Sequence, residues 1–353
     1  MREKLRIATL FSGIGTPEIA LRELGVDFSI TFACEIDKYA RKTYLANHNI
    51  NKEHFHDDVS AFDAKRYKDS VDILIAGSPC QPFSIAGYKE GFDDPRGKLF
   101  FDMIDRIDEC NPKVVLFENV KNILTHNNKK TFKIVVDEFK RIGYKNISYR
   151  IVDAREFGSI QRRKRLFLIA SKEQEIEIVK KREISNNESV FEEILEENIP
   201  EKYLIQTKSR KYLDDEVQVG KIVRNRWDFK YHLDTGEQYS PTMTANLSVG
   251  VPNNVLIDRD MCKFNLWTCD FAGSELCSLC SEFGENYQHN YNPTPAVRRL
   301  MPREVARLQG IKDSFSFPVS DTQAYRQIGN SMEIKTLKTL LLDIKNNLEE
   351  VAC

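Results

Sequence analysis

The chain has 353 residues, of which 41% are hydrophobic and 30% are charged, and its formal net charge is −1 at pH 7. This length suits one large domain and a smaller one. The composition is that of a soluble globular protein, and no apolar stretch is long enough to cross a membrane. Because the total charge is close to zero, a nucleic-acid partner would require a local basic surface.

The cellular setting is predicted from the N-terminus and the cysteines. The first residues lead directly into a predicted strand, so no signal peptide is visible. With eight cysteines and no secretory signal, we expect a cytoplasmic protein in which Cys80 stays a free thiol. We also expect the chain to act as a monomer.

Strands and helices alternate through the first half of the chain. The first helix is predicted to have Thr16 as its N-cap and Pro17 at its first helical position. The predicted strands are Arg6–Phe11, Ser29–Cys34, Val71–Ala76, Val114–Phe117, Tyr149–Val152 and Arg165–Ala170. The predicted helices are Pro17–Leu24, Asp37–Ala46, Lys98–Glu109, Thr131–Arg141, Pro302–Gln309 and Ser331–Leu348. This alternation predicts an α/β fold with a doubly wound, mostly parallel sheet.

The β–α rhythm stops after Ser171. Residues 203–297 contain many turn formers and isolated short strands, which predicts a second, smaller, irregular domain. This region also holds four cysteines, Cys262, Cys269, Cys277 and Cys280. The last two have the spacing of metal ligands, but the other gaps match no standard zinc module. Scattered reduced thiols are therefore favoured over a structural zinc site.

A thiol and a carboxyl group follow two of the predicted buried strands. Cys80 comes just after the strand ending at Ala76, and Glu118 comes directly after Phe117. Open α/β sheets bind ligands at the carboxyl ends of their strands, so both groups are expected at one rim. Their pairing suggests covalent attack assisted by proton transfer. The alternatives are a small buried apolar residue at Cys80 and an ordinary surface carboxylate at Glu118.

A glycine-containing turn follows the first strand. Gly13 and Gly15 let the backbone pass close to a ligand, although a plain strand-to-helix turn is an equal alternative. Glu35 ends the second strand, where an acidic group suits a ribose diol. Asp58 is placed to receive an adenine amino group. A nucleoside without a demanding phosphate site points to S-adenosylmethionine.

A basic segment precedes the last strand of the first half. Alternate strand residues face the same way, so Gln161, Arg163 and Arg165 are predicted to point together at the rim. Forked guanidinium donors suit phosphate oxygens or a base carbonyl. The alternative is a solvated run of charges.

Nine blocks, taken in order, resemble the cytosine carbon-5 DNA methyltransferases. They cover roughly residues 5–170 and 298–332. The blocks are Phe-x-Gly-x-Gly at 11–15, Glu35 with Asp37, Asp58-Val59, Pro79-Cys80-Gln81, Asp94–Phe100, Glu118–Lys121, Gln-x-Arg-x-Arg at 161–165, Arg299–Gly310 and Gln323–Ser331. Departures from the family pattern are small and remove no catalytic group.

The resemblance implies methyl transfer from S-adenosylmethionine to carbon 5 of a flipped-out cytosine in a specific double-stranded DNA sequence, leaving S-adenosylhomocysteine. Cys80 would attack carbon 6, and Glu118 would hydrogen-bond ring nitrogen 3 and the exocyclic amine. Arg163 and Arg165 would hold the base carbonyl and a phosphate, and no metal is required. The implied cofactor pocket consists of Phe11, Gly13, Gly15, Glu35, Ile36, Asp58, Val59, Pro79, Leu99, Asn330 and Ser331.

The resemblance also implies a division of the chain. We expect a catalytic domain over residues 1–195 and 321–353 and a target-recognition domain over 196–320. Tyr239–Ala245 resembles the short threonine segment that precedes the base-reading loops. The implied partner is double-stranded DNA, and the sequence leaves open whether a separately encoded restriction endonuclease accompanies the enzyme.

Three other interpretations remain open at the level of sequence. One is a tRNA cytosine-5 methyltransferase, but that branch has a shorter middle region with a Cys-Phe-Thr segment that this chain lacks. Another is a non-catalytic DNA-binding regulator, against which the intact Cys80, Glu118 and Arg163 argue. The third is transfer of a modified methyl group from an altered cofactor.

Overall fold

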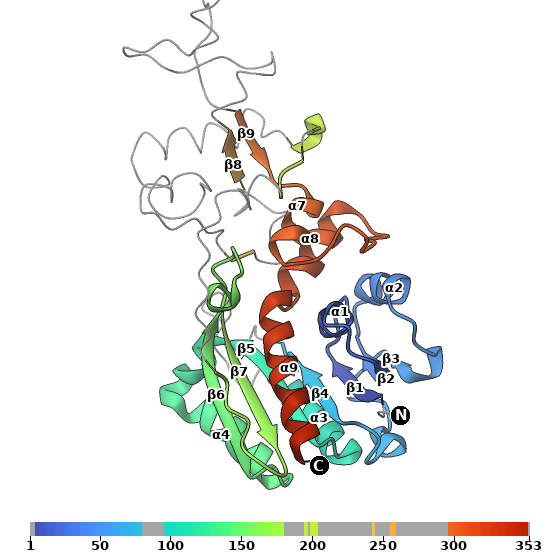
Figure 1. Ribbon diagram of the computed structural model, residues 1–353, viewed down its shortest axis with the longest axis vertical. Coiled ribbons are helices and arrows are strands. Elements are labelled where there is room, and N and C mark those ends of the chain that lie inside the picture. The colour runs from blue at the N-terminus through green and yellow to red at the C-terminus, as the bar shows by residue number, and fades with distance from the viewer. Residues whose placement is uncertain are drawn as a thin grey trace, which may run out of the picture.

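The computed structural model describes residues 4–79, 95–179, 194–196, 198–203, 242–243, 255–258 and 296–351. Its centre is a seven-stranded sheet with the order β3-β2-β1-β4-β5-β7-β6, shown in Figure 1. The strands are β1 (Leu5–Leu10), β2 (Phe28–Cys34), β3 (Phe55–His56), β4 (Ile73–Ala76), β5 (Val114–Val120), β6 (Asn146–Asp153) and β7 (Lys164–Ser171). Neighbouring strands from β3 to β5 are parallel, whereas β7 is antiparallel to β5 and β6. The predicted mostly parallel α/β sheet is confirmed.

Helices cover both faces of this sheet. On the first face α1 packs beside α9, and on the second lie α3 and α4 (Figure 1). The α-helices are α1 (Thr16–Glu23), α2 (Lys38–Asn47), α3 (Pro95–Cys110), α4 (Lys130–Arg141), α7 (Pro302–Leu308), α8 (Asp321–Asn330) and α9 (Ile334–Val351). Helix α9 crosses the sheet although it lies at the far end of the chain, so the C-terminal residues belong to the same layered unit as the N-terminal ones.

Alternate strand residues supply the two halves of the core. Ile73 and Ile75 of β4 lie in a cluster with the apolar side of α9, whereas Leu74 and Ala76 lie in the cluster that includes α3 and α4. Since successive side chains of a strand point to opposite faces, a strand buried on both faces must be apolar throughout. This is why the short central strands read as continuous apolar runs.

Two local expectations need correction. Gly15, not Thr16, is the N-cap of α1; it has φ 80°, and no side chain caps this helix end. The left-handed glycine turns the chain into the helix, so Thr16 becomes its first residue. Asp37 lies outside α2 as its N-cap and accepts hydrogen bonds from the amides of Tyr39 and Ala40.

The C-terminal helices also differ from the prediction. The expected single helix over Ser331–Leu348 begins three residues later, as α9, and is preceded by a separate helix, α8. Helix α8 has Ser331 as its C-cap in an extended conformation. Asn330 and Ser331 therefore lie at the junction between the two helices.

Little of the predicted irregular region lies in the described residues. They include an antiparallel pair formed by β8 (Val255–Asp258) and β9 (Ala296–Arg299). The four cysteines from Cys262 to Cys280 lie outside the described residues. Leu300, Val305 and Phe315 share the hydrophobic cluster that contains Ile7 of β1, so the segment around α7 packs with the sheet domain.

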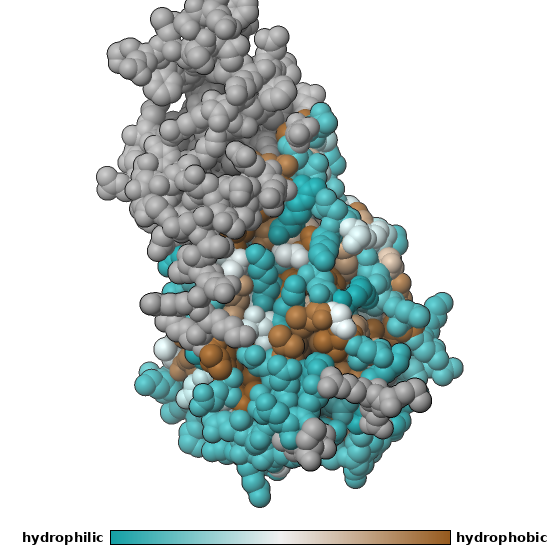
Figure 2. Space-filling view, in the orientation of Figure 1, coloured by the Kyte–Doolittle hydropathy of each residue, from teal (hydrophilic) through white to brown (hydrophobic). Residues whose placement is uncertain are grey.

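The described part of the face drawn in Figure 2 is mainly hydrophilic. Figure 2 shows polar side chains over most of this face, with apolar ones gathered across its middle at the height of α1. Within the described ranges, no helix is both long and apolar enough to span a membrane. The same residues contain no group of three or more histidine, cysteine, aspartate or glutamate side chains arranged to hold a metal ion.

Candidate active site

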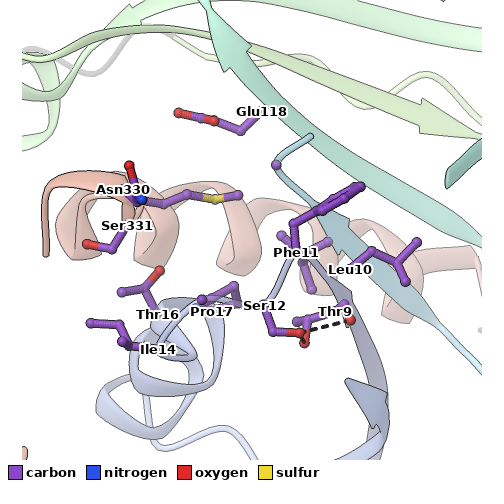
Figure 3. A pocket seen from close by; sticks show the side chains of 14 residues that line it. Thr9, Leu10, Phe11, Ser12, Ile14, Thr16, Pro17, Glu118, Asn330 and Ser331 are labelled. Carbon is purple, nitrogen blue, oxygen red and sulfur yellow. Dashed lines mark hydrogen bonds between the residues drawn. The ribbon is translucent and has the colours of Figure 1, made fainter. Parts of the chain in front are cut away.

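A pocket opens where the strand order reverses, between β1 and β4. Beyond β1 the sheet continues to β2 and β3, and beyond β4 it continues to β5, so the crossover connections diverge at this point and leave a crevice at the carboxyl ends. The described residues lining it are Thr9, Leu10, Phe11, Ser12, Gly13, Ile14, Thr16, Pro17, Ile75, Gly77, Glu118, Asn330, Ser331 and Met332. In Figure 3 the side chains of Phe11, Glu118 and Asn330 border one space, although they come from distant parts of the sequence.

One wall of the pocket is the glycine loop, defined here as residues 11–15. Phe11, Gly13 and Gly15 all have left-handed backbone angles, with φ 55°, 56° and 80°. A Cβ atom at Gly13 would have no neighbour within 4 Å, so this side of the loop is open. The loop therefore presents bare backbone to the pocket at Gly13.

Glu35 fastens this loop to the second strand. Its Oε2 accepts a hydrogen bond from the Gly13 amide at 2.8 Å, and its Oε1 accepts one from the Asp37 amide at 2.8 Å. Burial raises the pKa of the Glu35 carboxyl, while these two amide hydrogen bonds oppose that rise. The carboxylate is thus fixed beside the glycine loop at the end of β2.

The residues next to Glu35 fit the face of a nucleoside. Ile36 is 70% exposed, so its apolar side chain is accessible beside the Glu35 carboxylate. Asp58 follows β3, and its Oδ1 accepts hydrogen bonds from the amide and the hydroxyl of Ser60. Val59 behind it is buried. An apolar contact, a carboxylate beside the loop and open glycine backbone together suit an adenosine group.

The predicted cofactor residues are divided by the structure into two groups. Those lining the pocket are Phe11, Gly13, Asn330 and Ser331. Those outside its lining are Gly15, Glu35, Ile36, Asp58, Val59, Pro79 and Leu99. Pro79 is half-buried after β4, and the half-buried Leu99 on α3 packs against the second core cluster. Gly15 ends the loop, and its missing Cβ leaves room for His48 on the side away from the pocket.

The opposite wall contains Glu118 at the rim of β5. Its side chain is 14% exposed, and Oε1 lies 3.2 Å from Nε of Arg165 on the neighbouring strand β7. Glu118 and Phe167 are paired across the antiparallel ladder, which brings Arg165 to the same end of the sheet. The carboxyl group predicted to reach the rim is therefore there, with a guanidinium group beside it.

The segment that leads to Cys80 is fixed by Asn119. This side chain is fully buried, and its Nδ2 donates to Oγ of Ser78 at 3.1 Å. Gly77 is also crowded, since a Cβ there would lie 3.0 Å from the Met332 methyl group and 3.5 Å from Glu118 Oε2. Cys80 itself lies outside the described residues. Ser78, two residues before Cys80, is therefore held against Asn119, the residue that follows Glu118.

Arg163 occupies a different place from Arg165. It is 4% exposed, and its guanidinium donates to the carbonyls of Met243 (3.0 Å), Gly329 (3.2 Å) and Ser331 (2.7 Å). Burial alternates as expected, because Gln161, Arg163 and Arg165 are buried or half-buried while Arg162 and Lys164 are exposed, but Arg163 and Arg165 contact different partners. The three carbonyl contacts direct the Arg163 guanidinium toward the backbone of residues 243, 329 and 331.

Gln161 and Gln309 continue this buried junction. Side-chain Nε2 of Gln161 donates to Oε1 of Gln309 at 2.6 Å, and side-chain Nε2 of Gln309 donates to the Ser331 carbonyl at 2.8 Å. The Met243 amide donates to Oε1 of Gln161 at 3.3 Å. Side chains from two distant segments thus hold the backbone of residues 242–243 and 329–331.

Sequence reasoning missed several of these groups. Asn119, Gln309 and Met332 were not singled out, although each contacts or lines the site. Asn119 carried one usable signal: it is a polar residue within an otherwise apolar strand. Gln309 was included only as part of the block Arg299–Gly310, and Met332 lies in no block, because the contacts of both depend on which distant segment faces them.

The comparisons with known proteins agree with this geometry. Residues 5–346 match the family model described as C-5 cytosine-specific DNA methylase. The chain is 33% identical to the Type II methyltransferase M.NlaX of Neisseria lactamica, with 98% of both chains covered. It is 29% identical to the orphan methyltransferase M.SPRI of Bacillus phage SPR, with 97% of both covered.

A solved structure shares the fold. The Entamoeba histolytica methyltransferase EhMeth superimposes with a TM-score of 0.68 at 16% identity, covering 98% of this chain and 99% of that one. At this identity the likeness establishes the architecture alone. The family match over nearly the whole chain carries the assignment: the chain belongs to the C-5 cytosine-specific DNA methylases, enzymes that methylate carbon 5 of cytosine in DNA.

Proposed function

We propose that this chain transfers a methyl group from S-adenosylmethionine to a flipped-out cytosine within a specific double-stranded DNA sequence. The observation that supports this most directly is the pocket at the β1–β4 crevice, which has a nucleoside-compatible glycine loop on one wall and Glu118 on the other. When bound, S-adenosylmethionine supplies an electrophilic methyl group and leaves as S-adenosylhomocysteine. The cofactor and the base would meet in the space between these walls.

The cofactor side of the pocket is suited to hold adenosine. Glu35 has its two oxygens fixed by backbone amides, and each carboxylate oxygen can accept a further hydrogen bond, here from the ribose hydroxyls. Ile36 and Phe11 would contact the adenine ring, and Asp58 would receive its amino group. Asn330 and Ser331 close the pocket from the C-terminal side. Gly15, Val59, Pro79 and Leu99 would shape this site from behind.

The base side provides the chemistry on cytosine. The Cys80 thiolate forms a bond to carbon 6, and the ring electrons displaced by this addition make carbon 5 nucleophilic. Carbon 5 takes the methyl group, a base removes the hydrogen from carbon 5, and the bond between Sγ and carbon 6 breaks. Glu118 would hydrogen-bond ring nitrogen 3 and the exocyclic amine, which relieves the charge that the attack creates.

The two arginines take different parts in this proposal. Arg165 lies beside Glu118 and would meet the base carbonyl or a neighbouring phosphate. Nη1 and Nη2 of Arg163 donate to three protein carbonyls. Arg163 is therefore assigned a positioning role. The target base must leave the duplex to reach either wall.

Sequence specificity is assigned to the target-recognition domain over residues 196–320, with the catalytic domain over 1–195 and 321–353. The last part of the first range, around α7, shares the hydrophobic core of the sheet, so the base-reading part is assigned to residues 200–297. Replacing residues 200–297 with the segment of a relative should change the methylated sequence while preserving turnover. A chimera that still modifies the original sequence would overturn this division. The chain is proposed to act as a monomer in the cytoplasm, alongside a separately encoded restriction endonuclease.

A duplex with 5-fluorocytosine at the target position tests the covalent step. Fluorine cannot leave carbon 5 as a cation, so Cys80 should stay bonded to the base after methyl transfer. The complex should survive denaturing electrophoresis, require S-adenosylmethionine and yield a peptide modified at Cys80. Cys80→Ala should abolish trapping and turnover yet still bind DNA, because phosphate contacts do not need the sulfur. A folded Cys80→Ala protein that methylates DNA would refute the mechanism.

A further inference from the structure

We propose that Glu18, Tyr44 and His48 form a buried bracket that holds the glycine loop in its cofactor-binding shape. The inference rests on the proposed function, because it names residues that act on the cofactor through the loop. None of the three lines the pocket. They lie on the side of the loop opposite to it, and their role would be to position Gly13 and Ile14.

The first part of the bracket joins α1 to α2. The Tyr44 hydroxyl donates to Oε1 of Glu18 at 2.6 Å, and the hydroxyl of Thr9 on β1 lies 3.1 Å from the same oxygen. Glu18 and Tyr44 are both fully buried. Burial, with Glu18 beside it, raises the pKa of Tyr44 well above its usual range, so the phenol keeps its proton and remains a donor.

The buried position of Glu18 costs free energy of folding. Its Oε2 is buried and has no hydrogen-bond partner among the described residues. Burying a carboxyl group without satisfying both oxygens costs free energy, and an apolar side chain of similar size would be cheaper. A polar group kept here at that cost points to a requirement for the Tyr44 contact rather than for simple filling of the core.

The second part of the bracket is His48, which reaches the loop directly. Its Nε2 lies 3.0 Å from the carbonyl oxygen of Ile14, and its Nδ1 lies 3.2 Å from Nη2 of Arg22. Burial lowers the pKa of His48, which favours the neutral ring. Since a guanidinium can only donate, Nδ1 accepts, and Nε2 carries the proton that it donates to Ile14.

Gly15 shows how closely the bracket approaches the loop. A Cβ atom at this residue would lie 2.3 Å from His48 Nε2 and 2.9 Å from Tyr44 Cε2. On the other side, Gly13 has open space and donates its amide to Glu35. The backbone of the loop therefore separates the bracket from the pocket. A movement of His48 or Tyr44 would displace the loop and change the surface that it presents to the ligand.

Four variants test whether the bracket positions the loop or only fills the core. His48→Ala removes the tether, His48→Gln keeps a donor for Ile14 and an acceptor for Arg22, and Tyr44→Phe deletes one hydroxyl. The matched control is Tyr144→Phe, because Tyr144 is equally buried and donates to the Pro112 carbonyl at 2.7 Å, far along the chain from the loop. The readouts are the Kd of S-adenosylhomocysteine by calorimetry, KM and kcat for S-adenosylmethionine, and urea unfolding.

We expect His48→Ala and Tyr44→Phe to raise Kd and KM by roughly 5- to 30-fold, the usual consequence of losing one buried hydrogen bond, with a smaller fall in kcat. His48→Gln should recover most of the affinity, and Tyr144→Phe should lose stability but not affinity. Equal Kd values for Tyr44→Phe and Tyr144→Phe would overturn the inference. If His48→Ala does not fold, Tyr44→Phe decides.

The wild-type protein separates this inference from the proposed function. If the unaltered chain neither binds S-adenosylhomocysteine nor methylates DNA, the proposed function fails. If it does both, and the bracket variants bind S-adenosylhomocysteine as tightly as wild type, only the bracket inference fails.

Discussion

The two walls of the pocket are built in different ways. The glycine-loop wall is made from residues 9–48, so its turn, its capping groups and its supports lie within about one β-α-β unit. The Glu118 wall is assembled from segments that lie far apart in the sequence, since Arg163 alone contacts residues 80, 166 and 168 positions away. The glycine loop and its supports are thus a local structure, whereas Glu118, Arg163 and the residues 329–331 that close the pocket come together only when distant segments pack.

Substitutions in the two walls should therefore affect different properties of the protein. A change behind the glycine loop should alter one binding surface and leave the rest of the molecule in place. A change in the buried junction of Gln161, Arg163 and Gln309 removes ties between the sheet, α7 and the turn between α8 and α9. We therefore expect affinity effects on the first side and combined stability and activity effects on the second.

The largest effect is expected at Glu118. Glu118→Gln keeps the shape but cannot donate a carboxyl proton, so adduct formation with a 5-fluorocytosine duplex should slow by about 10²–10⁴-fold. The rate is measured by sampling the trapped complex over time. Glu138→Gln on α4, whose partner is the nearby Arg141, should leave the rate unchanged. Equal rates for Glu118→Gln and wild type would remove Glu118 from the chemistry.

The two arginines should separate stability from turnover. Arg163→Leu deprives three buried carbonyls of a donor, so the free energy of unfolding should fall by about 2–5 kcal/mol. Arg165→Leu leaves those carbonyls untouched and should lose less stability but more turnover per folded molecule. Urea unfolding and single-turnover methylation distinguish them. If both variants lose the same stability, the contrast between a positioning and a base-facing arginine is wrong.

The Glu35 carboxylate should have an intermediate effect confined to the cofactor. Glu35→Ala deprives the Gly13 and Asp37 amides and the ribose of an acceptor, so binding of S-adenosylmethionine should weaken by roughly 1–3 kcal/mol. Calorimetry measures this loss directly. An unchanged affinity in a folded variant would dismiss the ribose assignment.

The smallest effect concerns His48 and pH. Because its pKa is lowered in the folded protein, the unfolded chain binds the proton more readily once the pH falls below about 6.5. The stability that the neutral ring contributes is therefore complete above that pH and is lost as the pH falls toward the folded-state value. The slope from this group is at most about 1.4 kcal/mol per pH unit.

Urea unfolding between pH 5 and pH 8 checks this expectation. His48→Gln cannot titrate in that range, so its stability should fall less steeply with decreasing pH than that of wild type. Parallel curves for the two proteins would show that His48 is not the buried neutral ring described here.

Much of the molecule follows from the sequence by itself. Apolar strand runs and helical spacing predicted the main sheet and the helices that cover it, because burial on one or two faces imposes a short local period. The same local pattern placed Glu35 directly after β2 and predicted the alternating burial of Gln161, Arg163 and Arg165. It ended one strand at Phe117, whereas β5 continues through Glu118 to Val120. The order of the blocks indicated the family, which the match over residues 5–346 confirms.

The tertiary structure decided which partners these side chains meet. Nothing near Arg163 in the sequence indicates that its donors end on Met243, Gly329 and Ser331, and the sequence alone suggested a substrate contact instead. Likewise, Glu18 and His48 read as ordinary residues until α1 and α2 are packed behind the loop. Periodicity is encoded by neighbours along the chain, but a hydrogen bond requires two groups to come within about 3 Å, and only the folded arrangement of distant segments determines that.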